Sequence, residues 1–176
     1  MKFFSDIRLL LLAIWLGASV FFIGVAQAAF SVVPERELAG AVVGRSLSTL
    51  NYGGMIIAAI LILTSLVGSS GINQIWLWIE RFLLLVLGAA AAVGQFVIGI
   101  WLASVRAQIG RPIDEVAADD PLKVQFNMLH EYSVWTMFVG MAAALIAFFI
   151  IANRKFGKTV TAAKPDIYDF SKEFKT

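Results

Sequence analysis

His130 is the side chain of this sequence best suited to chemistry, because it is the only histidine. Imidazole titrates near neutral pH and can ligate a metal through a neutral nitrogen. Asn127 precedes His130 by three residues, so on a helix both side chains would share a face. Glu131 follows directly and would point about 100° away. These residues predict a polar patch at one end of an otherwise apolar segment.

Other polar residues end or begin the remaining apolar segments. We expect them to reach the depth of His130 near the outer membrane surface, as one outer polar cluster. Its predicted members are Gln27, Asn51, Tyr52, Arg106, Asn127, His130 and Glu131.

Three interpretations of His130 remain open. It is a hydrogen-bonded structural residue that ties the outer helix ends together, an axial ligand to haem or a chlorophyll-type pigment, or part of a shallow solute, metal or proton site. Ionisable residues inside a membrane are functional candidates by default. We favour the structural interpretation, because the cost of desolvating a side chain is small at the membrane edge. A bound lipid is a further candidate ligand.

Most other chemistry finds no support in the sequence. There is no cysteine, which excludes disulfides, thiolate metal sites and cysteine nucleophiles. No phosphate-binding loop, nucleophile elbow or dinucleotide fingerprint occurs. The net charge of +2 gives no reason to expect a nucleic acid partner. We therefore expect a non-enzymatic protein that does not bind nucleic acid.

The elements that must position these residues are four uncharged apolar runs, which cover residues 9–33, 51–67, 82–105 and 132–153. They are between 17 and 25 residues long, and a helix needs about 20 apolar residues to cross a bilayer. Within the bilayer, a single helix can pair its own backbone N–H and C=O groups in hydrogen bonds. The sequence predicts an all-α, polytopic four-helix bundle over residues 1–156 and a tail over 157–176.

Two prolines suggest that the second and fourth helices begin before their apolar runs. Asp120 and Pro121 have the residue types of an N-cap and a first helical position. Pro34 gives a similar start, from which a helix either continues into the second run or breaks at the Gly53-Gly54 pair.

Small residues four apart predict close helix packing, either within the bundle or at a dimer face. We favour the bundle. The pairs are Gly54/Ala58, Gly88/Ala92 and Gly140/Ala144.

Basic residues predict the orientation. Nine Lys and Arg residues fall on the side of both termini and five on the other side. Because cytoplasmic loops carry the excess of positive charge, both termini should be cytoplasmic. The Ala26-Gln27-Ala28 segment resembles a signal cleavage site, but the first apolar run is longer than a signal core, so we expect it to be retained.

The C-terminal tail carries a short amphipathic pattern. Ile167, Phe170 and Phe174 share one helical face among charged neighbours. We expect this segment to lie on the membrane surface or to dock on a partner.

Two motifs carry a family resemblance: Trp15-Leu16-Gly17 followed by Phe21, and the FNMLHEYS segment over 126–133. The chain resembles bacterial four-helix membrane proteins of unknown function that are related to the eukaryotic transmembrane-protein-205-like group. The resemblance covers roughly residues 9–152. It implies the four-helix fold, a role for His130 and a link to drug or metal tolerance, but no reaction.

We therefore expect an accessory subunit of a larger photosynthetic or respiratory complex in the bacterial inner membrane. Its partners would be the lipid bilayer and other membrane subunits, bound through the apolar faces and the tail. One alternative is a solute or metal transport or resistance protein with a shallow site at His130. Another is a pigment- or haem-binding subunit that uses His130 as ligand.

Overall fold

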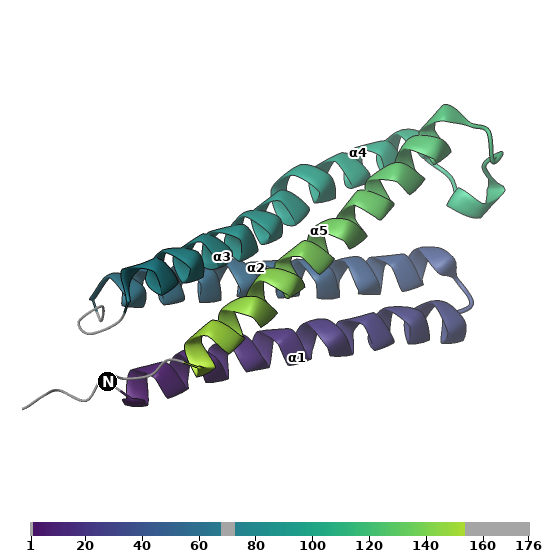
Figure 1. Ribbon diagram of the computed structural model, residues 1–176. Coiled ribbons are helices and arrows are strands. Elements are labelled where there is room, and N and C mark those ends of the chain that lie inside the picture. The colour runs from purple at the N-terminus through teal and green to yellow at the C-terminus, as the bar shows by residue number, and fades with distance from the viewer. Residues whose placement is uncertain (1, 68–72, 154–176) are drawn as a thin grey trace, which may run out of the picture.

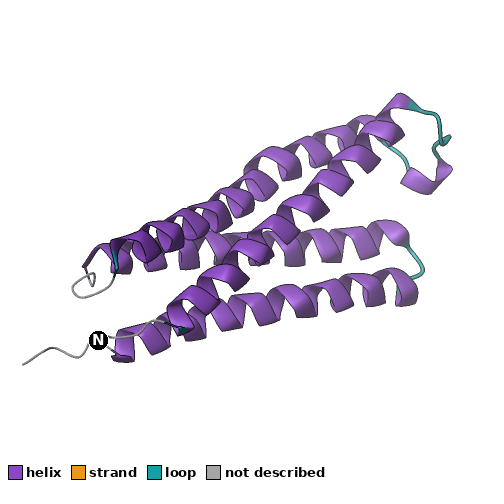
Figure 2. Ribbon diagram, viewed as in Figure 1, coloured by secondary structure: helices purple, strands orange, loops and turns teal. Residues whose placement is uncertain are grey.

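The chain folds into four long helical rods, shown by a computed structural model that describes residues 2–67 and 73–153 (Figure 1). Helices account for nearly all of the described residues, and short loops join them (Figure 2). The longest are α1 (Lys2–Val32), α2 (Arg36–Val67) and α5 (Pro121–Ala152). The remaining rod joins α3 (Gln74–Ala92), the π-helix η1 (Val93–Ile98) and α4 (Gly99–Ile109), and the 3-10 turn η2 (Ile113–Glu115) follows it.

All four rods are long and apolar enough to cross a membrane. The prediction of an all-α protein with four transmembrane helices is therefore confirmed. The predicted amphipathic segment of the tail lies outside the described residues.

The proline signals locate both helix starts. The Asp120 carboxylate accepts a hydrogen bond from the Leu122 backbone N–H at 2.8 Å, and Pro121 opens α5. The helix α2 begins two residues after Pro34 and continues through Gly53 and Gly54 without a break. The alternative in which the helix from Pro34 continues into the second apolar run is therefore confirmed, and Asn51 lies in the middle of α2.

The helices form a ring in which α1 packs on α2, α2 on α3, α3 on α5, and α5 on α1. The start of α1 and the end of α5 lie at the same end of the bundle (Figure 1). We call this the inner end and the other the outer end. That the inner end faces the cytoplasm stays a prediction from the charge distribution.

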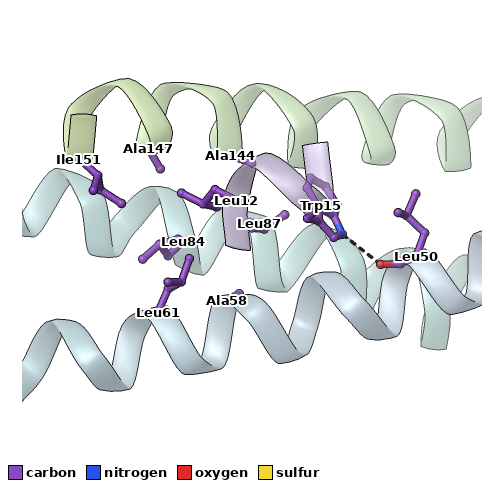
Figure 3. Close-up of a cluster of buried hydrophobic side chains, with 10 residues drawn as sticks. All are labelled: Leu12, Trp15, Leu50, Ala58, Leu61, Leu84, Leu87, Ala144, Ala147 and Ile151. Carbon is purple, nitrogen blue, oxygen red and sulfur yellow. Dashed lines mark hydrogen bonds between the residues drawn. The ribbon is translucent and has the colours of Figure 1, made fainter. Parts of the chain in front are cut away.

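The most continuous hydrophobic core fills the inner half of the bundle (Figure 3). It contains the side chains of Leu12, Trp15, Leu50, Ala58, Leu61, Leu84, Leu87, Ala144, Ala147 and Ile151. The Trp15 indole N–H donates to the Leu50 carbonyl at 3.1 Å. Trp15 and Leu50 are the outermost members of this cluster on α1 and α2.

Small residues bring the helices together around this core. A Cβ at Gly88 would lie 3.3 Å from the Ala58 Cβ, and one at Gly140 would lie 3.5 Å from the Ala90 Cβ. Gly54 is tighter still, because a Cβ there would lie 2.9 Å from the Trp15 Nε1. The small-residue pairs at Gly54, Gly88 and Gly140 therefore serve packing within the bundle, as we favoured.

A buried ion pair joins three helices near the inner end. The Arg8 guanidinium on α1 donates to the Glu80 carboxylate on α3 and, at 2.8 Å, to the Leu61 carbonyl on α2. Arg8 is 7% exposed and Glu80 is fully buried. The sequence assigned Arg8 only a role in orientation and did not indicate this contact.

A second arginine, Arg81, forms hydrogen bonds near the same inner end of the bundle. Arg81 donates from Nε to the Ser65 hydroxyl at 3.0 Å and from Nη2 to the Ser65 carbonyl at 2.8 Å. The inner ends of α2 and α3 are thus linked by charge-assisted hydrogen bonds, which are stronger than neutral ones.

Removing one partner of the buried ion pair should destabilise the fold strongly. We expect Arg8→Ala to lower the free energy of unfolding by about 3–5 kcal/mol, because the Glu80 carboxylate then stays buried without its guanidinium partner. The measurement is unfolding in mixed micelles with a denaturing detergent.

The exposed loop residue Arg111 supplies the control, since Arg111→Ala removes the same charge and should have little effect. The double variant R8M/E80M should lose less stability than either single variant, because it removes both buried charges of the pair together. Additive losses would contradict this account.

Candidate functional site

The structure separates the predicted outer polar cluster into several places. Arg106 forms an ion pair with Glu37 at 2.8 Å, near the start of α2. Asn51 lies 14 residues after Glu37, which is roughly 20 Å farther along the helix. Gln27 is exposed on α1, the helix that packs on α2. The predicted residues therefore do not converge on one shallow site.

His130 and its two polar neighbours project away from the bundle. Asn127, His130 and Glu131 are all exposed on α5. Among the described residues, His130 neither donates nor accepts a hydrogen bond. The described residues therefore give no hydrogen bond that would support the favoured structural interpretation of His130. The described residues also contain no group of three or more His, Cys, Asp or Glu able to hold a metal ion.

Asn51 occupies the most enclosed polar position of the predicted cluster. It is 8% exposed, and its side chain packs against Gly94 in the π-helix. A Cβ at Gly94 would lie 3.3 Å from the Asn51 Nδ2, so glycine makes room for the amide. The neighbouring Tyr52 ring meets Phe96 edge-on, with ring centroids 6.0 Å apart. This point is where α2 crosses the π-helix.

A second glycine accommodates the π-helix itself. The Gly99 N–H bonds to the Gly94 carbonyl, five residues back. A Cβ at Gly99 would come within 3.2 Å of that carbonyl oxygen. Single π-helical turns inside α-helices occur frequently at functional sites. The contact between Asn51 and the π-helix is therefore a second interior feature, besides the Arg8–Glu80 pair, that the sequence did not indicate.

The signal that could have indicated this feature is a seven-residue spacing along α2. Residues seven apart lie within about 20° of each other on a helix. Most members of this stripe contact the α3–α4 rod: Ser65 meets Arg81, Ala58 meets Gly88, Asn51 meets Gly94, and Glu37 meets Arg106. The remaining member is Gly44, where a Cβ would meet nothing within 4 Å.

This arrangement belongs to a recognised sequence family. The family described as a domain of unknown function, DUF4149, matches residues 10–111, which is more than half of the chain. The chain belongs to this family. The match includes most of α1 and all of α2, η1 and α4, so it covers Asn51 and the π-helix. No curated protein and no solved structure matches the chain.

The family match ends before α5. His130 and the 126–133 segment therefore lie outside the residues that match the family. The matched residues of this chain include Trp15, the seven-residue stripe of α2 and the π-helix.

Adding a methyl group at Gly94 should disturb the Asn51 contact. We expect Gly94→Ala to lower the free energy of unfolding by about 1–3 kcal/mol, because the Cβ forces the Asn51 amide to move. The matched control is Gly24→Ala on α1, where a Cβ would meet nothing within 4 Å. That variant should be neutral or slightly stabilising, since alanine favours a helix over glycine.

Truncating the amide tests the cause of the loss. In an Asn51→Ala background, Gly94→Ala should have little effect, because the colliding group is gone. Thermal unfolding in detergent measures the stability of all four variants, including the Gly24→Ala control. An equal loss with and without Asn51 would show that the contact is not responsible.

Proposed function

We propose that the protein is a non-enzymatic accessory subunit that associates with other membrane-spanning subunits in a larger complex of a bacterial inner membrane. The observation that carries this proposal is the exposed outer part of α5. There, polar and aromatic side chains lie on one face and point away from the bundle.

This α5 outer face follows helical spacing. Its members are Asn127, His130, Glu131, Val134, Trp135 and Phe138. All six are exposed, and Trp135 reaches 62%. Residues three and four apart are neighbours on a helix, so the six form a continuous surface.

The chemistry of the α5 outer face suits a partner helix. Polar residues inside membrane segments usually face a bundle interior or pair with one another. Here they face outward at the outer end of a segment that is long and apolar enough to span, and the exposed residues Val134, Trp135 and Phe138 continue the same face along the helix. A neighbouring transmembrane helix would supply hydrogen-bonding partners for Asn127 and His130. It would also cover Trp135, since buried aromatic residues supply much of the binding energy at protein interfaces.

The transport alternative receives less support from the geometry. A solute site needs its polar groups to converge, whereas Arg106 and Asn51 lie far apart along α2 and His130 points outward. The proposal retains the cytoplasmic position of both termini and the relationship to the transmembrane-protein-205-like group, which rest on the charge distribution and on the sequence motifs.

A photo-crosslinking residue placed on the α5 outer face should capture the partner. We expect Trp135 replaced by a photo-reactive phenylalanine to crosslink a second membrane protein in native membranes, because that face contacts the partner. Mass spectrometry of the product identifies it. The matched control is the same replacement at Ile56, which is 60% exposed on α2.

The outcome that would contradict the proposal is a chain that purifies alone and crosslinks no more protein at position 135 than at position 56. His130→Ala should reduce the copurified partner. The absorption spectrum of the purified complex separates the pigment alternative: loss of colour in His130→Ala would support a ligand role, and unchanged colour would reject it.

A further inference from the structure

The contact between α2 and the α3–α4 rod is interrupted at Gly44. Asn51 and Gly94 close the contact on the inner side of this point, and the Glu37–Arg106 ion pair closes it on the outer side. At Gly44 itself a Cβ would meet no atom within 4 Å. Gly44 lies within about 20° of Asn51 on the helix surface, so it faces the same side. An opening therefore separates α2 from α4 here.

The two helices diverge at this level. Figure 1 shows α2 and α4 moving apart toward the outer end. In this region α4 packs on α5, while α2 touches the rod through η1. The Arg106 guanidinium reaches across, and a Cβ at Gly40 would lie 3.9 Å from its Nη1. We name the space between Asn51 and this ion pair the Gly44 window.

The window has apolar sides and a charged outer edge. Leu47 on α2 and Leu102 on α4 share the faces of Asn51 and Arg106, and both are only half-buried. From Asn51 to Gly40 the window measures about 16 Å along α2. At one end α2 contacts η1 and at the other end it contacts α4, so a transmembrane helix from a partner could not pass through. A single flexible hydrocarbon chain could enter from the side.

We propose that the Gly44 window holds one acyl chain of a phospholipid, with the lipid phosphate bound by Arg106. Guanidinium recognises phosphate through paired hydrogen bonds. Glu37 stands beside Arg106 at 2.8 Å and offers an acceptor for an ammonium group. The pair therefore complements a zwitterionic headgroup such as phosphatidylethanolamine. This site is independent of the α5 outer face and of the proposed function.

The test fills the window without disturbing its walls. Gly44→Leu places a side chain where a Cβ has no neighbour, so the fold should tolerate it. We expect this variant to retain about tenfold less added phosphatidylethanolamine than the native protein. Native mass spectrometry of protein released from detergent micelles counts the bound lipid. Gly24→Leu is the matched control, because Gly24 on α1 also has open space around it, and it should retain lipid normally.

Arg106→Gln tests the headgroup contact. This variant should retain less phosphatidylethanolamine and lose its preference for that lipid over diacylglycerol, which has no phosphate. Glu37→Gln keeps the guanidinium and should retain the preference for a phosphate-bearing lipid.

Equal lipid retention by Gly44→Leu and the native protein would overturn the proposal, as would a native protein that binds phosphatidylethanolamine no better than diacylglycerol. If Gly44→Leu instead lowers copurified protein and leaves lipid unchanged, the occupant is a protein segment and the proposal is wrong. Crosslinking at Trp135 is unaffected by these outcomes, so the two proposals fail separately.

Discussion

The buried pair of Arg8 and Glu80 is the contact on which the inner half of the bundle depends. Hydrocarbon supplies no hydrogen-bonding partner, so charged groups must be paired within the protein. Arg8 donates both to the Glu80 carboxylate and to the Leu61 carbonyl, which fixes α1, α2 and α3 at one level. The apolar core between this level and Trp15 is then closed on all sides by small and branched side chains.

The outer half of the bundle is packed less closely than the inner half. On α1 the inward face is fully buried at Leu12 and Ser19, but the same face at Phe22 is only half-buried. On α5 it is buried at Gly140 and half-buried at Met137. Beyond Ser19 the helices therefore continue mainly as pairs, with α1 against α2 and α4 against α5. The side chains of the four helices therefore pack less closely at the outer end than at the inner end.

Sequence patterns were sufficient for features that depend on local chemistry. Long apolar runs indicate four helices because a bilayer leaves few alternatives, and Asp120 with Pro121 locates a helix start through one side-chain hydrogen bond. Features that depend on pairing between distant residues were not accessible. Glu80 lies next to an apolar run, and nothing local shows that Arg8, 72 residues earlier, will meet it. The sequence left the position of Asn51 along its helix open for a related reason, since the uncharged run begins at Asn51 while the helix begins at Arg36.

The seven-residue stripe of α2 explains why the opening occurs at Gly44. Such a stripe drifts by about 20° per repeat on a straight helix, so from Ser65 to Glu37 it turns by roughly 80°. Side chains near Ser65 and Ala58 can meet the partner rod directly, but a straight helix cannot hold that contact over four repeats. At Gly44 there is no side chain to bridge the growing distance. Contact resumes only where the long side chains of Glu37 and Arg106 span it. Contact between α2 and the α3–α4 rod thus depends on small residues toward the inner end and on two long charged side chains at the outer end.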